Sequence, residues 1–140
     1  MTAFECCNTD VVSASPDAKV MEVVRMMDEK NVGCVIIVEK QMPVGIITDR
    51  DVVLRVMGKE KDPKKIAVRD VMTKDPVVVE GGKGLFEAMR KFEGKNFRRM
   101  PVVDERGRVT GILTTDDMIR LLSKELSFIT TVIQAQTPNI

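Results

Sequence analysis

Two stretches of the chain place apolar residues at the i, i+3, i+4 and i+7 positions of a helix. The first comprises Val20, Val23, Val24 and Met27, and the second comprises Leu85, Ala88, Met89 and Phe92. This spacing predicts one amphipathic helix in each stretch, with a single buried stripe. Ser15 followed by Pro16 predicts the cap and first turn of the earlier helix.

Each predicted helix is followed by two short runs of apolar, largely β-branched residues with a polar turn between them. The runs are residues 35–38 and 44–47 in the first half, and 101–103 and 109–113 in the second. They predict a strand pair in each half. A further helix should follow each pair, burying Val52, Val53 and Val56 in the first half and Met118, Ile119 and Leu122 in the second. The predicted order in each half is strand, helix, strand, strand, helix.

The two halves are copies of one motif. Residues 17–39 align with residues 82–104 at a shift of 65, so that Glu22 meets Glu87 and Arg25 meets Arg90. After the strand turn the shift becomes 66, which one extra turn residue explains, and GIITDRD at 45–51 meets GILTTDD at 111–117. One such unit buries too little apolar surface to be stable alone. We therefore expect an α/β fold in which two β-α-β-β-α units pack sheet to sheet about a pseudo-two-fold axis.

The repeat also divides the chain. The first unit is expected at residues 5–58 and the second at 70–126, joined by a polar connection at 59–69. Residues 127–140 contain Phe128, Ile129, Val132 and Ile133 at near-helical spacing and are expected to extend the last helix.

Composition weighs against several classes of function. The 140 residues carry 22 Lys+Arg and 21 Asp+Glu, a net charge of +1, which lacks the basic excess of nucleic-acid binders. There is no His, which removes Ser-His-Asp and Cys-His nucleophile pairs and most zinc and iron sites. The three Cys form no C-x-x-C motif, and no apolar run approaches the ~18 residues that span a bilayer. A soluble cytoplasmic protein with reduced thiols is the expectation.

The Gly-x-x-Thr-x-x-Asp endings carry the candidate chemistry. Thr48 with Asp51, and Thr114 with Asp117, stand where a strand runs into a helix. One interpretation is a capping box, in which each side chain bonds the backbone of the first turn. The other is a nucleotide site, because a helix N-terminus and a Thr hydroxyl attract phosphate and an ionised Asp accepts both hydroxyls of a ribose. Occurrence in both halves favours the nucleotide site, while the acidic first turns are explained by the helix dipole without a metal.

These motifs resemble the cystathionine beta-synthase (CBS) domain, whose tandem pairs form the Bateman module. The resemblance rests on DVMTKDP at 70–76, RRMPVVD at 98–104 and the two Gly-x-x-Thr-x-x-Asp endings, and it covers residues 5 to about 126. It implies a regulatory module and not an enzyme. Such pairs commonly bind AMP, ADP, ATP or S-adenosylmethionine in clefts between the two units. Neither a catalytic residue nor a metal site is implied.

The resemblance also implies the residues of two clefts. In the first cleft, Thr114 would face the phosphate, Asp117 the ribose and Ile112 the adenine, with Arg98 and Arg99 gripping phosphate and Val12, Val32 and Gly33 enclosing the base from the opposite unit. The mirror cleft would use Thr48, Asp51 and Ile46 with Val77, Phe97 and Arg98. Because Gly33-Cys34 stands where the second unit has Arg98-Arg99, we expect unequal sites, with phosphate favoured in the first cleft.

The partners expected are an adenosyl ligand, a second copy of the chain and a protein target in trans. The resemblance implies two modules side by side as a flat homodimer, and the 14 residues after Leu126 leave no room for a catalytic domain. Membrane and nucleic-acid partners are not expected. Two alternatives stay open: a dimerisation scaffold with vestigial clefts, and a small nucleotide hydrolase that uses carboxylates and metal. The absence of His and of a Walker-type loop weighs against the hydrolase.

Overall fold

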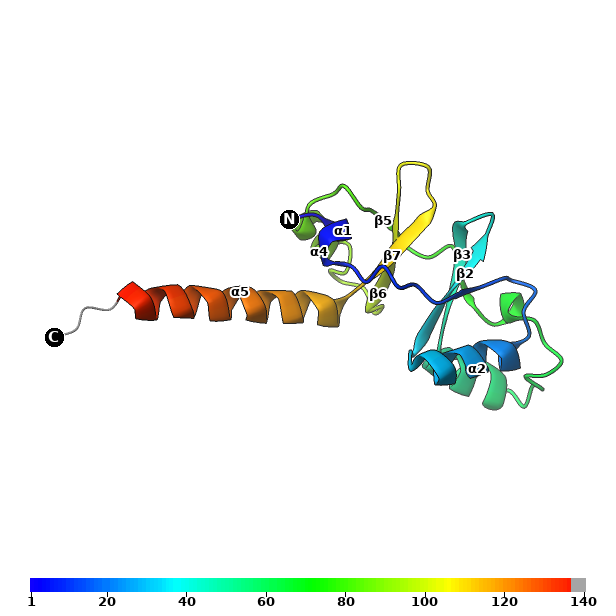
Figure 1. Cartoon of the computed structure of the whole chain (residues 1–140). Coiled ribbons are helices and arrows are strands. Elements are labelled where there is room, and N and C mark those ends of the chain that lie inside the picture. Colours follow the sequence, from blue (N-terminus) through cyan, green and yellow to red (C-terminus); the bar gives the residue numbers. More distant parts are fainter. Residues whose placement is uncertain (137–140) are drawn as a thin grey trace.

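The computed structural model describes residues 1–136 and has a mixed α/β fold with two sheets (Figure 1). The first half contains β1 (Ser13–Ala14), α2 (Val20–Lys30), β2 (Cys34–Glu39), β3 (Met42–Thr48), α3 (Asp49–Asp51) and η1 (Val52–Met57). The second half contains β5 (Val79–Glu80), α4 (Leu85–Arg90), β6 (Arg99–Val103), β7 (Val109–Thr114) and α5 (Thr115–Gln136). The remaining elements are α1 (Ala3–Cys6), η2 (Val68–Asp70) and β4 (Thr73–Lys74). The predicted order of elements is confirmed in both halves.

The two hairpins are equivalent except for their turns. Ile37 pairs with Gly45 in β2–β3, and Val102 pairs with Gly111 in β6–β7, so one more residue separates the second pair. The first turn is short, because Lys40 and Gln41 both adopt the left-handed conformation that closes a two-residue hairpin. The extra residue therefore lies in the turn, as predicted.

The predicted cap of α2 is wrong, because the helix begins at Val20 and not at Ser15-Pro16. The Ser15 hydroxyl accepts the N–H of Asp17 at 3.2 Å, which closes a local turn instead. Lys19 then forms a β-bridge with Ala67, and this holds its backbone extended. The helix can start only after that bridge.

Each half has its own apolar core. The predicted stripe of α2 is buried through Val20, Val23 and Met27. In the second half only Ala88 is buried; Leu85 and Met89 are half-buried, and Phe92 lies beyond the end of α4 at Arg90. Burial of Val56 and Met118 in the later helices is also confirmed.

The predicted burial of Val53, Ile119 and Leu122 is wrong. Their side chains are 53%, 61% and 52% exposed, respectively. Each helix turns one stripe toward its own sheet, and these three residues lie outside that stripe. The later helices therefore carry an exposed apolar face.

The segment that precedes each half packs on the opposite half. Ala3 of α1 is fully buried in the second core, where its N–H donates to the Lys83 carbonyl at 2.8 Å. Val68 and Val71 are buried in the first core, and β4 pairs with β3. In Figure 1 the chain crosses from α1, beside α4, to the sheet that α2 covers. The boundaries at residues 58 and 70 stay a prediction.

α5 extends well beyond the body of the molecule (Figure 1). The predicted helical extension after Leu126 is confirmed as far as Gln136, and residues 137–140 lie outside the described part. Over residues 1–136, no helix has the length and apolar character needed to cross a bilayer.

Candidate functional site

A pocket of about 360 Å³ lies between the two halves, and we call it the inter-unit pocket. The structure brings together at its walls all eight residues expected for the first cleft: Val12, Val32, Gly33, Arg98, Arg99, Ile112, Thr114 and Asp117. They come from both units, so neither half forms the pocket alone. A larger hollow of about 590 Å³ beside Phe4 and Gly81 contains none of the expected residues.

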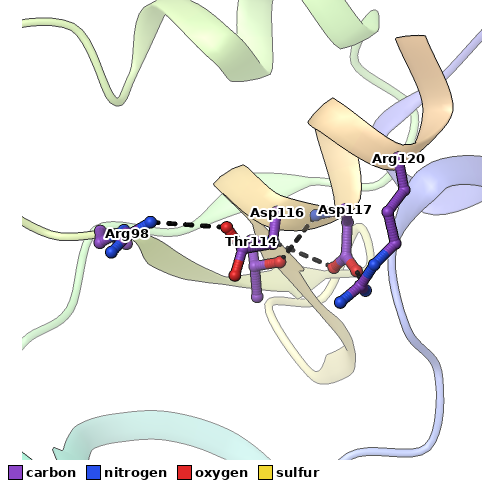
Figure 2. A network of polar contacts seen from close by, with 5 residues as sticks. All are labelled: Arg98, Thr114, Asp116, Asp117 and Arg120. Atoms are coloured by element: carbon purple, nitrogen blue, oxygen red, sulfur yellow. Dashed lines mark hydrogen bonds and ion pairs between the residues drawn. The ribbon is translucent and has the colours of Figure 1, made fainter. Parts of the chain in front are cut away.

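Thr114 and Asp117 form a complete capping box at the start of α5 (Figure 2). The Asp117 N–H donates to the Thr114 hydroxyl at 3.0 Å, and the Thr114 N–H donates to Asp117 Oδ2 at 3.2 Å. The capping interpretation is therefore correct, and it leaves the second carboxylate oxygen, Oδ1, outside the cap. The cap thus uses one carboxylate oxygen of Asp117, and the Thr114 hydroxyl, which accepts in the cap, still has a proton to donate.

Three arginines, Arg98, Arg99 and Arg120, line the pocket. Arg98 and Arg120 are paired with carboxylates (Figure 2). Arg98 Nη2 lies 3.5 Å from Asp116 Oδ1, and Arg120 Nη1 lies 3.3 Å from Asp117 Oδ1. Arg99 forms no ion pair with any carboxylate of residues 1–136. A cation without a partner at the wall of a pocket favours an anionic ligand group.

Gly33 lies next to charged side chains from both units, Asp49 of the first and Arg99 of the second. A Cβ atom at this position would lie 3.5 Å from Arg99 Nη2 and 3.1 Å from Asp49 Oδ2. A side chain at position 33 would crowd the Asp49 carboxylate, whereas the Arg99 guanidinium would lie at an ordinary contact distance.

Cys34 lines the same pocket but is only 8% exposed. Burial raises the pKa of its thiol to about 12, an effect that the positive charge of Arg99 only partly offsets. A thiol that stays protonated at neutral pH is a poor nucleophile. Cys34 is therefore part of the apolar wall and not a reactive group.

Gly45 and Gly111 are required by the crossing segments. A Cβ on Gly111 would collide with Cys7 Sγ and would lie 3.0 Å from the Asn8 carbonyl oxygen. Asn8 and Ile112 exchange two backbone hydrogen bonds of 3.0 and 2.9 Å at this point. Gly45 is covered in the same way by Met72. Close packing of the chain explains these glycines without a ligand.

The mirror cleft is built differently. Thr48 and Asp51 repeat the capping box, with hydrogen bonds of 3.2 and 3.0 Å. Arg55 lies 3.8 Å from Asp51 Oδ1 and donates to the Val71 carbonyl at 3.0 Å. Five pockets of about 210–590 Å³ among residues 1–136 are lined by none of Thr48, Asp51, Ile46, Val77 and Phe97. Phe97 packs on Phe92 with ring centroids 5.6 Å apart, and Val77 is 43% exposed.

Sequence reasoning missed several residues of the inter-unit pocket. Asn8 and Asp10 reach it through the crossing segment, for which the sequence carries no local signal. Arg120 had a usable signal, since a residue three positions after Asp117 lies on the same helix face. Within the described residues, no cluster of three or more acidic, Cys or His side chains is arranged to hold a metal ion.

Comparison with known proteins identifies the architecture. A family model described as the CBS domain matches residues 3–58 and 68–124. An uncharacterized protein from Methanopyrus kandleri is 36% identical over 118 residues, which are 84% of this chain and 60% of that protein. The chain thus spans less than two thirds of this relative.

Two solved structures have similar folds. The hexameric CBS-CP12 protein from bloom-forming cyanobacteria matches with a TM-score of 0.74 and 31% identity, over 85% of this chain and 69% of that one. The CBS domain pair of protein MJ0100, solved with 5′-methylthioadenosine and S-adenosyl-L-methionine, matches with a TM-score of 0.79 and 23% identity. That match covers 89% of this chain and 98% of the other.

Proposed function

Because the chain belongs to the CBS domain family and carries two CBS domains in tandem, we propose that it is a regulatory module that senses an adenosine-containing ligand. The ligand classes are AMP, ADP, ATP or S-adenosylmethionine, and the site is the inter-unit pocket. The MJ0100 domain pair, which shares the fold, supports the adenosyl class because it was solved with two adenosyl compounds.

One observation carries the proposal: the eight expected residues of the first cleft, which come from both units, line one pocket. Asp117 Oδ1 lies outside the helix cap, where it is able to accept the hydroxyls of a ribose. Val12, Val32 and Ile112 offer apolar contacts for a base. Arg99, which has no carboxylate partner within residues 1–136, is the cation available to a phosphate.

Calorimetric titration and thermal shift with AMP, ADP, ATP and S-adenosylmethionine test the proposal. A ligand that binds only the folded state raises Tm. Asp117→Ala should weaken binding by roughly 10- to 100-fold, the range expected for hydrogen bonds to a charged group. Glu5→Ala is the matched control, since it removes the acidic member of another capping box, that of α1, and Glu5 lies outside both expected clefts. Absence of heat and Tm shift with all four compounds would refute the sensor function.

We also propose that the module associates with a second copy through α5. The exposed residues Ile119, Leu122, Leu126 and Ile129 recur at alternating spacings of three and four, which is the pattern of a helix–helix seam. A two-fold axis places the same stripe of a second copy against it, so the surface is self-complementary. This face also favours a second candidate function, a dimerisation scaffold. Intact self-association without any response to ligand would support the scaffold.

The regulatory proposal includes a protein target in trans, and it assigns no catalytic role to the chain. The pocket carries no activated nucleophile, since its one thiol has a raised pKa. A turnover assay with ATP and Mg²⁺ tests this part, and nucleotide hydrolysis that depends on Asp117 would overturn it. The cytoplasmic location stays a prediction.

A further inference from the structure

We infer that Arg120 sets the charge selectivity of the inter-unit pocket, disfavouring an uncharged nucleoside and favouring a phosphorylated one. The inference rests on the proposed function, because it takes Asp117 as the group that receives the ribose. It assigns a role to a residue that lies outside the two Gly-x-x-Thr-x-x-Asp motifs.

The starting point is the use of the two Asp117 oxygens. Oδ2 accepts the Thr114 N–H and belongs to the helix cap, while Oδ1 accepts from Arg120 Nη1 at 3.3 Å (Figure 2). The Asp117 side chain is 19% exposed, so few directions of approach to Oδ1 remain. A ribose that binds Oδ1 therefore competes with the Arg120 guanidinium for the same atom.

Arg120 is free to move when this competition occurs. Its side chain is 77% exposed, so reorientation breaks little packing. Because it starts from the second turn of α5, its long side chain stays at the pocket wall after it leaves Oδ1. A phosphate on the ligand offers the displaced guanidinium a new anionic partner, whereas adenosine offers none. The lost ion pair is thus replaced only when the ligand carries phosphate.

The other arginines near the two caps do not share this position. Arg98 is paired with Asp116, and Arg99 has no carboxylate partner among residues 1–136. In the first unit, Arg55 also pairs with the free cap oxygen, Asp51 Oδ1, at 3.8 Å, but its guanidinium is held in addition by the Val71 carbonyl at 3.0 Å. Of the arginines in the described residues, Arg120 alone forms its ion pair with the proposed ribose-binding carboxylate.

Calorimetric titration of adenosine and ADP into the wild type, Arg120→Ala and Lys124→Ala tests the inference. Arg120→Ala should bind adenosine about two- to fivefold more tightly, because it frees Oδ1 from an exposed ion pair. The same variant should bind ADP roughly tenfold more weakly, because a charge-assisted contact to phosphate is lost. Lys124→Ala removes an equal charge from the exposed surface of α5 and should leave both affinities within about twofold.

The affinities for adenosine and ADP should change in opposite directions in Arg120→Ala, and this distinguishes a role in selectivity from a structural role. Equal weakening of both ligands in Arg120→Ala, or no change in either, would overturn the inference. Arg120→Lys retains the charge and should keep most of the preference for ADP, and loss of that preference in a folded Lys variant would also count against it. A wild type that binds neither adenosine nor ADP would overturn this inference, whereas the proposed function falls only if AMP, ATP and S-adenosylmethionine also fail to bind.

Discussion

Cys34 lines the inter-unit pocket and yet carries a thiol that stays protonated at neutral pH. Burial is the main cause of its raised pKa, and the carboxylates of Asp51 and Asp49 add to the effect while Arg99 opposes it. The folded state therefore retains the thiol proton at a pH where the unfolded chain has lost it.

This difference predicts a loss of stability in alkali. The ordinary pKa is 9.0 and the folded value is about 12, so the stability present below pH 9 should fall as pH rises toward 12. The slope contributed by Cys34 should approach roughly 1.4 kcal/mol per pH unit. Urea unfolding at pH 8, 9.5 and 10.5 measures it. Cys34→Ala should show a shallower decline, and identical slopes would contradict the prediction.

The sequence identified eight of the 17 residues that line the inter-unit pocket but not their bonding. Thr114 and Asp117 stood out because the motif occurs twice. The sequence did not show that Oδ2 caps α5 while Oδ1 faces Arg120, because that depends on side-chain orientation. Arg98 was expected in both clefts, and the structure places it at the wall of the inter-unit pocket.

At the scale of elements, Gly45 and Gly111 occupy equivalent strand positions, but a side chain would meet different neighbouring atoms at each. A Cβ on Gly45 meets only side-chain atoms of Met72, which is flexible. A Cβ on Gly111 meets Cys7 and the backbone oxygen of Asn8, which is fixed by two hydrogen bonds to Ile112.

Gly111→Ala should therefore be more destabilising than Gly45→Ala. The expected difference in unfolding free energy is about 1–3 kcal/mol, the usual cost of overpacking where the backbone must shift. Urea unfolding of the two variants measures it. Because Asn8 lines the inter-unit pocket, Gly111→Ala should also weaken ligand binding, whereas Gly45→Ala should not. Equal destabilisation by both substitutions would contradict the prediction, because both crossing segments would then shift at the same cost in free energy.

Periodicity predicted the long elements correctly and failed where pairing partners are distant in sequence. The hairpins and the apolar stripes of α2 and α4 follow from local patterns. The start of α2 depends on a bridge between Lys19 and Ala67, and β4 has only two residues, so neither has a local signature. The exposure of Ile119 and Leu122 was missed because periodicity identifies an apolar face but not what covers it.

At the scale of the whole molecule, the exposed stripe of α5 predicts self-association. Leu126→Glu places a charge in the proposed seam and should convert a dimer to a monomer in analytical ultracentrifugation. Thr131→Glu introduces the same charge on another face of α5 and should leave the dimer intact. A Leu126→Glu variant that sediments like the wild type would exclude this face as the contact.

The segment that precedes each half packs in the core of the other half, and this couples the unfolding of the two halves. The first core contains Val68 and Val71, and the second contains Ala3, so each interior includes residues from beyond its own stretch of sequence. If one half unfolds, the other loses residues of its own apolar core. We therefore expect a single cooperative unfolding transition and not two. A small molecule bound in the inter-unit pocket would then stabilise both halves against unfolding.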